Sequence, residues 1–154
     1  MSETRAISAA VRMLEAIRQL TPLTREGVAA LFAAQGWDGS GASWDKDGTG
    51  GWVHPYNGGV RVEFTLWMRE PDEDTGYFDD VEAAYAAGER ALAAFLPRLE
   101  SSALARHLRP AGSTEEDADE FVAHKRWSLG GRTLVAGVVQ EDTDLPVRVV
   151  LALE

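Results

Sequence analysis

Residues 60–69 show the clearest alternation of hydrophobic and polar positions in the chain. The apolar positions are Val60, Val62, Phe64, Leu66 and Met68, and the intervening positions hold Arg61, Glu63, Thr65, Trp67 and Arg69. Successive side chains of a β-strand point to opposite faces of its sheet. Strict alternation therefore predicts a strand with one buried face and one solvent-facing face, which is typical of an antiparallel sheet. On this interpretation Met68 belongs to the core and Trp67 lies on the solvent side.

Three stretches repeat apolar residues at helical spacing and predict amphipathic helices. Residues 5–19 form the first, and residues 24–35 form the second, which begins with a threonine suited to cap it. Residues 81–99 keep the same period. Pro97 lies inside this third stretch, so we expect it to kink the helix or to start a new one ending near Leu108.

The remaining segments predict strands joined by polar turns. Residues 120–129, 132–140 and 147–154 have the pattern of a three-stranded meander, and the Gly-rich residues 38–59 hold two short, weak strands. Residues 110–119 are polar and predict a loop. Helices and strands come in blocks rather than in alternation, which favours the α+β class. The sequence thus predicts one α+β domain over residues 1–154, a single antiparallel sheet with helices packed on one face.

Composition agrees with a globular protein of one domain. The chain has 154 residues, of which 45% are hydrophobic and 26% are charged. It has no cysteine, so disulfides and thiolate metal sites are excluded, and the cytoplasm is the expected location. No apolar run approaches the ~20 residues of a membrane helix, and the beginning of the chain lacks the pattern of a signal peptide.

The charge balance says most about partners. The chain carries 25 acidic and 15 basic side chains, a formal net charge of −10. Much of the surplus gathers in three short runs that have the composition of loops, residues 72–80, 115–120 and 141–144. The negative electrostatic potential of such a surface repels nucleic acid and anionic membranes and attracts cationic surfaces. We therefore expect neither nucleic acid nor a membrane as partner, and we expect another protein of basic character.

One acidic segment resembles the opening of a calcium-binding loop. Residues 45–50 place oxygen-bearing side chains at positions one, three and five and glycine at position six. Position twelve, where a bidentate glutamate should stand, is Tyr56, and no helix pattern flanks the segment. A hairpin turn at Asp47 and Gly48 is the favoured interpretation. The histidines have no metal-binding spacing either, so no metal site is expected: His54, His107 and His124.

No catalytic or cofactor signature is present in the sequence. No serine stands in a nucleophile elbow, and the glycine clusters do not follow a strand and open a helix as a phosphate-binding loop does. Acid–base catalysis by carboxylates needs burial that shifts their pKa, whereas the acidic runs have the pattern of solvated loops. We therefore expect a protein that is not an enzyme and that holds no cofactor.

Trp67 is the candidate anchor for a partner. On the strand prediction it lies on the solvent side between Arg61 and Arg69, and exposed aromatic residues flanked by charge are typical of binding sites. The alternative is that the Gly-rich residues 39–59 cover it. The adjoining acidic residues would steer a basic partner, and they complete the predicted partner-binding site: Asp72, Glu73, Asp74, Asp79 and Asp80.

A family resemblance follows from the order of elements and a few residues. A helix closing on Gly36 and Trp37, Trp127 ahead of a glycine turn and two apolar strands, and the turn at Leu145 and Pro146 resemble small acidic proteins of unknown function from high-GC bacteria. Some proteins of this kind are encoded beside secreted toxins and resemble immunity proteins. The resemblance covers most of the chain, implies a binding role without catalysis, and carries over no catalytic residue.

Three functions remain open from the sequence. The leading hypothesis is a cytoplasmic, non-enzymatic protein that binds a basic protein, as an immunity or inhibitor factor does. The second is a small-molecule binder or enzyme, with a pocket between sheet and helices lined by residues such as Tyr85, His124, Arg126 or Trp127. The third is a dimeric protein similar to a secretion chaperone. The sequence names neither the partner nor the oligomeric state.

Overall fold

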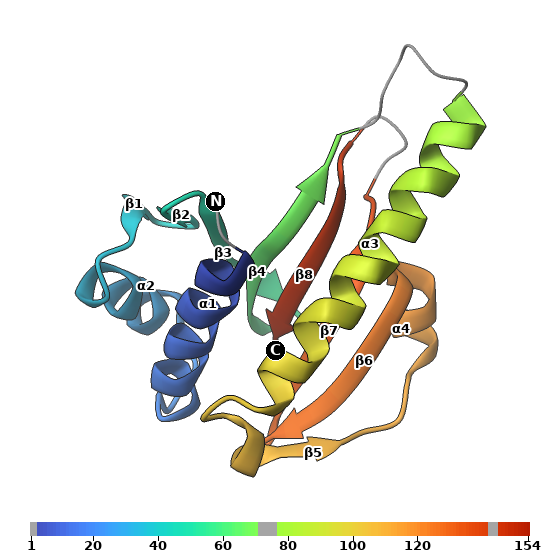
Figure 1. The fold of residues 1–154 in the computed structure, drawn as a ribbon. Helices are drawn as coiled ribbons and strands as arrows, with labels where there is room; N and C mark the ends of the chain where they lie inside the picture. Colours follow the sequence, from blue (N-terminus) through green and yellow to red (C-terminus); the bar gives the residue numbers. More distant parts are fainter. Residues whose placement is uncertain (1–2, 71–76, 142–144) are drawn as a thin grey trace.

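The computed structural model describes residues 3–70, 77–141 and 145–154. The strands of these residues form one antiparallel sheet of eight strands (Figure 1). The elements in chain order are α1 (Glu3–Arg18), α2 (Arg25–Ala34), β1 (Asp38–Ser40), β2 (Ser43–Lys46), β3 (Thr49–Tyr56), β4 (Gly59–Arg69), α3 (Tyr77–Glu100), the 3-10 turn η1 (Ala105–His107), β5 (Leu108–Pro110), α4 (Glu115–Glu120), β6 (Phe121–Leu129), β7 (Arg132–Val139) and β8 (Val147–Leu153). The strand order across the sheet is β1-β2-β3-β4-β8-β7-β6-β5. The predicted α+β class and antiparallel sheet are confirmed.

The first two helices form where the apolar period and the caps predict them. The Thr24 hydroxyl accepts a hydrogen bond from the Gly27 amide at 3.1 Å, which satisfies one of the free donors at the start of α2. The helix ends before Gly36, whose φ of 81° lies in the left-handed region that favours glycine. Trp37 then folds back and meets Phe32 edge-on, with ring centroids 5.0 Å apart.

Helix α3 crosses the sheet over β7 and β8 and ends at Glu100 (Figure 1). The expectation of a further helix toward Leu108 is wrong. The helix continues through Pro97, the chain forms the 3-10 turn η1, and the edge strand β5 follows. Close approach of helix to sheet depends on Gly88, because a Cβ atom there would lie 2.9 Å from a methyl group of Val138.

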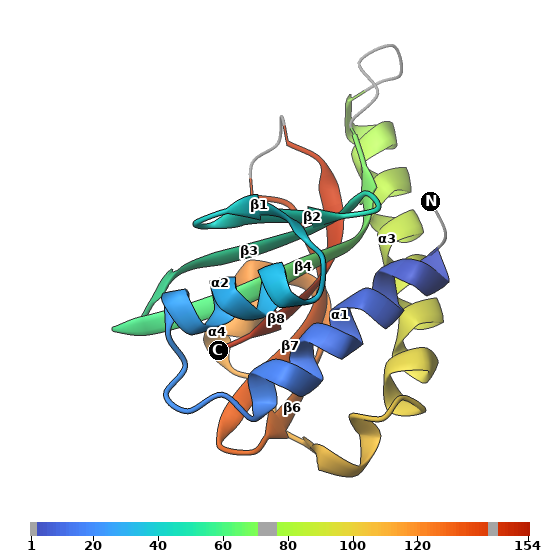
Figure 2. The ribbon, with the colours of Figure 1, turned by 90° about the vertical axis from the view of Figure 1, so that its left-hand side faces the viewer.

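The main core fills the space between one face of the sheet and the three long helices (Figure 2). Phe64 of β4 lies at its centre with no exposed surface, between the rings of Phe32 and Trp37 at 5.9 and 5.8 Å. Strands β7 and β8 contribute alternate residues to this core, as the meander pattern predicts. The members from these two strands are Leu134, Ala136, Val138, Val147, Val149, Leu151 and Leu153.

The short helix α4 lies on the other face of the sheet, behind β6 in Figure 1. It replaces the loop predicted for residues 110–119 and takes up the acidic run at residues 115–120. Its first turn is closed by a capping box, in which the Thr114 hydroxyl accepts from the Asp117 amide at 3.1 Å and the Asp117 carboxylate accepts from the Thr114 amide at 3.2 Å.

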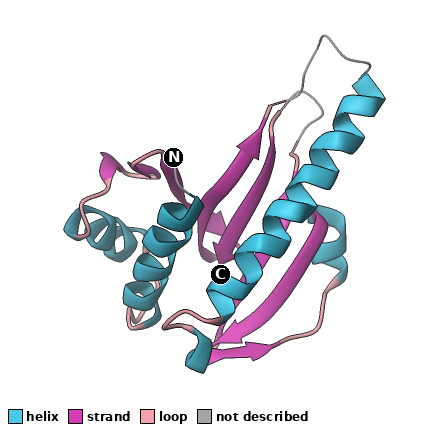
Figure 3. Ribbon diagram, in the orientation of Figure 1, coloured by secondary structure: helices cyan, strands magenta, loops and turns pink. Residues whose placement is uncertain are grey.

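The sheet curls around this second face. Arg61 on β4 reaches Glu120, next to β6, with nitrogen and oxygen 2.7 Å apart, although β8 and β7 lie between the two strands. Three strand spacings would separate them by about 14 Å in a flat sheet. We call this side the concave face. Its apolar residues form a second, smaller cluster: Phe121, Val135, Val139 and Val150. The long helices lie on the opposite side of the sheet, which we call the convex side (Figure 3).

A β-bulge interrupts the alternation of β4. Thr65 pairs with Val150 of β8 and Trp67 pairs with Val149, so Leu66 is an extra residue in β4. The side chains after the bulge therefore change faces. Trp67 lies half-buried against the main core and α3, whereas Met68 is 55% exposed on the concave face. The predictions that Met68 is buried and that Trp67 faces solvent are wrong.

Candidate functional site

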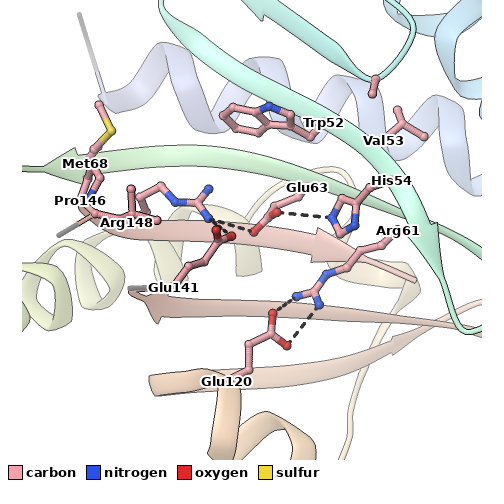
Figure 4. Close-up of a pocket in the computed structure, with 12 residues that line it drawn as sticks. Trp52, Val53, His54, Arg61, Glu63, Met68, Glu120, Glu141, Pro146 and Arg148 are labelled. Carbon is pink, nitrogen blue, oxygen red and sulfur yellow. Dashed lines mark hydrogen bonds and ion pairs between the residues drawn. The ribbon is translucent and has the colours of Figure 1, made fainter. Parts of the chain in front are cut away.

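The concave face holds a hollow of about 540 Å³ (Figure 4). Strands β3, β4 and β8 form its floor, and the residues just before β6 and β8 form its far wall. Its lining combines apolar and charged side chains. The apolar ones are Ala42, Trp52, Val53, Met68, Leu145 and Pro146, and the ionisable ones are His54, Arg61, Glu63, Glu120, Glu141 and Arg148.

The strand period places these side chains on one face. In β3, Trp52 and His54 alternate with Val53, which is buried in the main core. In β4, Arg61 and Glu63 point to the concave face before the bulge. Trp52 stands directly across from Glu63 in the antiparallel register of β3 and β4.

Arg61 is the buried centre of one charge cluster. Its guanidinium forms a two-point ion pair with Glu120, at 2.7 and 3.1 Å, and lies 3.9 Å from a carboxylate oxygen of Glu154. It also lies over the rings of Tyr56 and Phe121. Burial lowers the pKa of Arg61, and the hydrogen bond and charge of Glu120 outweigh it, so the pKa is raised. Arg61 is therefore a fixed structural cation.

Arg148 is the centre of a second cluster, which borders the hollow. It lies 3.0 Å from Glu141 and 3.8 Å from Glu63, donates a hydrogen bond of 3.1 Å to the Thr65 hydroxyl, and lies over the Trp52 ring. The contacts of Glu63 are looser than those of Glu141. Its carboxylate is 3.8 Å from Arg148 and 3.6 Å from His54, and both distances exceed those of hydrogen bonds. Dashed lines mark the two contacts in Figure 4.

A serine, a histidine and an aspartate meet beside α4 without forming a catalytic triad. The Ser113 hydroxyl lies 2.7 Å from His124 Nε2, and the same nitrogen lies 4.0 Å from Asp117. A triad needs the aspartate on the other ring nitrogen, where it fixes the tautomer. Both carboxylate oxygens of Asp117 bind Arg126, at 2.9 and 3.2 Å, so this aspartate secures α4 to β6.

The environment of Asp117 also sets its acidity. Burial raises the pKa of Asp117, but hydrogen bonds from Arg126 and Thr114 favour the charged form and outweigh the burial. The pKa therefore lies below its ordinary value of 3.8. At neutral pH this carboxylate is ionised and paired.

The structure separates the residues that the sequence predicted as one partner-binding site. Arg61 is buried in its ion pairs on the concave face rather than exposed. Trp67 lies on the convex side, packed against the main core, and a Cβ atom at Gly88 of α3 would lie 3.5 Å from its ring. Arg69 lies 3.1 Å from the buried Asp80 of α3. These positions place Trp67 and Arg61 on opposite faces of the sheet.

The other predicted acidic residues are not tested by the structure. Asp72, Glu73 and Asp74 lie outside the described residues. Asp79 belongs to the first turn of α3. Their role in partner binding therefore stays a prediction.

The hollow was not predicted from the sequence. Trp52, His54 and Tyr56 do alternate, and this pattern could have indicated a second populated face of β3. Nothing in the sequence marks Glu120 or Glu141 as part of this site. The contact of Glu120 with Arg61 depends on the curl of the sheet, and that of Glu141 with Arg148 depends on the chain path after β7.

The second hypothesis places a ligand pocket between the helices and the sheet, and the main core occupies this space. Its four candidate residues do not converge. Tyr85 and Trp127 pack on the core side, whereas Arg126 and His124 contact Asp117 on the other face. A site built on all four is therefore not present.

The predicted hairpin turn at Asp47 and Gly48 is confirmed. Both residues have positive φ, 52° and 88°, as a tight two-residue turn between β2 and β3 requires. The Asp45 carboxylate accepts a hydrogen bond from the Gly48 amide at 3.3 Å. Within the described parts of the chain, no group of three or more His, Asp or Glu side chains is arranged to hold a metal ion.

None of the described helices contains a stretch long and apolar enough to cross a membrane. Comparisons with protein-family models, with curated proteins and with solved structures find no match for this chain.

Proposed function

We propose that this chain is a non-enzymatic, cytoplasmic protein that binds a basic partner protein on its concave face, as an immunity or inhibitor factor does. The observation that carries the proposal is the hollow with its apolar rim. Met68 and Leu145 at this rim are 55% and 44% exposed. Exposed large apolar side chains around a concave site are the features that a protein partner buries.

Charge supports a basic partner. Three carboxylates line the hollow, on Glu63, Glu120 and Glu141, against two guanidiniums, on Arg61 and Arg148. The neighbouring hollow beside α4 adds Glu115, Glu116 and Glu154 against Arg126 alone. Complementary charge raises the rate of association with a cationic surface and suppresses acidic competitors. The net charge of −10 acts in the same direction at longer range.

A small cationic molecule is the second candidate ligand. The hollow of about 540 Å³ lies within the range of pockets that take such molecules. A protein partner is favoured because the apolar residues lie at the rim and not on the floor of the hollow. A small ligand bound on the floor would leave these rim residues exposed to solvent. A dimer similar to a secretion chaperone is a third possibility. Size-exclusion chromatography with light scattering would then give a particle with twice the mass of one chain.

Photo-crosslinking from the rim tests the proposal. A photoreactive phenylalanine derivative at position 68 reports on the concave face, and the same residue at the exposed position 89 of α3 is the matched control on the convex side. Both variants are expressed in the native host, and crosslinked proteins are identified by mass spectrometry. We expect a basic protein to be crosslinked from position 68 and not from position 89.

The purified partner is then measured by surface plasmon resonance at several salt concentrations. Association should slow as ionic strength rises, because screening shortens the reach of charge to about 8 Å at 0.15 M salt. An acidic partner, a rate that salt leaves unchanged, or crosslinking from position 89 instead of position 68 would contradict the proposal.

A further inference from the structure

We propose that the hollow receives an arginine or lysine side chain of the partner and that Glu63 is the residue that selects it. This inference rests on the proposed function, since it concerns the chemistry of the group that the partner inserts. It goes further by naming the recognised side chain and one specificity-determining residue.

The surroundings of Glu63 carry the inference. Glu63 is only 8% exposed and borders the hollow. Among the described residues its carboxylate has ion-pair partners within 4 Å in His54 and Arg148, at 3.6 and 3.8 Å, with Arg61 acting on it by charge, and neither distance is that of a hydrogen bond. His54 is charged only when protonated. A buried carboxylate normally accepts several short hydrogen bonds, because leaving it without them costs free energy. Glu63 thus has acceptor capacity that a donor entering the hollow can use.

Arg61, unlike Glu63, already has its terminal nitrogens bound by a partner within the chain. Its two terminal nitrogens are held by Glu120 at short distance. Its Nε is buried without a hydrogen bond among the described residues and lies 3.9 Å from a carboxylate oxygen of Glu154. An anionic guest would therefore find the terminal nitrogens of Arg61 already bound and the Nε buried, and it would meet the surplus of carboxylates. A cationic guest meets Glu63 and, at the rim, Glu141, whose side chain is 64% exposed.

The apolar lining fits the stem of a long basic side chain. Trp52 stands directly across from Glu63, and its indole already lies over the Arg148 guanidinium at 5.8 Å. Met68 pairs with Arg148 in the register of β4 and β8 and extends this apolar surface. Arginine and lysine bury their methylene stems along such surfaces while the charged head meets a carboxylate. Figure 4 shows Trp52, Met68 and Glu63 facing the same space.

Titration with two matched peptides tests the inference. The first is acetyl-Gly-Arg-Gly-amide. The second is acetyl-Gly-citrulline-Gly-amide, in which a neutral urea replaces the guanidinium with nearly the same shape. Binding is followed by two-dimensional ¹H–¹⁵N NMR, and the signals of the Trp52 indole and the Met68 amide report on the hollow. We expect the arginine peptide to shift these signals and to bind at least tenfold more tightly than the citrulline peptide.

Glu63→Gln is the decisive variant, because it keeps the shape of the side chain and removes its charge. We expect it to weaken the arginine peptide at least tenfold, about 1.4 kcal/mol, and to leave the citrulline peptide unchanged. Glu89→Gln, at an exposed position on the convex side, is the matched control and should bind as the unsubstituted protein does. The NMR spectrum itself reports whether each variant is folded.

Glu141→Gln provides a second variant at an exposed site, where folding is not at risk. We expect a smaller loss of affinity for the arginine peptide, because this carboxylate is already held by Arg148 at 3.0 Å and is screened by solvent. Equal binding of the two peptides, or undiminished binding by Glu63→Gln, would overturn the inference.

The inference and the proposed function fail in different ways. Suppose that a basic protein is crosslinked from position 68, but that the two peptides bind equally or that Glu63→Gln binds the arginine peptide undiminished. The inference about Glu63 then fails, and the proposed function stands. If the arginine peptide binds through Glu63 and no protein is crosslinked, the commitment to a protein partner fails and a free cationic ligand takes its place.

Discussion

The bulge in β4 makes a prediction that two neighbouring substitutions can test. Trp67 packs against the core and α3, and Met68 lies exposed on the opposite face. Trp67→Ala should therefore destabilise the protein, whereas Met68→Ala should have little effect. Without the bulge, the plain alternation of the strand predicts the reverse order.

The magnitude follows from burial. Removing a fully buried tryptophan side chain costs about 3–5 kcal/mol. Trp67 is half-buried, so we expect about 2–3 kcal/mol for Trp67→Ala. In a domain of this size each kcal/mol lowers the melting temperature by roughly 2–4 °C. We therefore expect a decrease of roughly 4–12 °C. Met68 is 55% exposed, and surface substitutions of this kind change stability by about 0.5 kcal/mol or less.

Urea unfolding followed by tryptophan fluorescence and circular dichroism measures both variants. The midpoint for Trp67→Ala should decrease with an unchanged slope, which identifies a change in stability rather than in compactness. Binding of the arginine peptide should stay the same in Trp67→Ala, because the residue lies on the other face of the sheet. A larger loss of stability for Met68→Ala than for Trp67→Ala would refute the assignment of faces after Leu66.

Three further predictions concern the core, the acid range and metal ions. Phe64→Ala should cost about 3–5 kcal/mol, because the ring is fully buried, and calorimetry should show a much smaller loss for Thr65→Ala. Asp117 has a pKa below its ordinary 3.8, so the stability from its pair with Arg126 is present above that pH and is lost as pH falls through the lowered pKa. Asp117→Asn should therefore flatten the acid side of a plot of melting temperature against pH and cost about 1.5–3 kcal/mol at pH 7. Melting curves with EDTA and with excess calcium should coincide, and an increase of several degrees with calcium would contradict the hairpin interpretation of the Asp45 segment.

Elements governed by local patterns were predictable. The second helix needed only an apolar period, Thr24 as cap and Gly36 as stop, and all three act within a few residues. Helix α4 was predictable in principle. Thr114 and Asp117 have the spacing of a capping box, and the acidic composition of the run concealed it.

Features that depend on distant pairing were not predictable. The bulge at Leu66 arises from the register between β4 and β8, and nothing in residues 60–69 marks it. The hollow depends on the curl that brings Arg61 to Glu120, across 59 positions of sequence. Alternation places a side chain on a face of one strand, but the partner strand decides where an extra residue is inserted and how far the sheet bends.

The ion pair between Arg61 and Glu120 has a consequence for the kinetics of recognition. It links β4 to the start of β6 across the two intervening strands. The width of the concave face is therefore fixed in the free protein, before a partner binds. A preorganised receptor loses little conformational entropy on binding. Association should then follow a single exponential whose rate rises linearly with partner concentration, with no slow isomerisation step. Loosening the tie by Glu120→Gln should add such a step while the contacts of the guest stay the same.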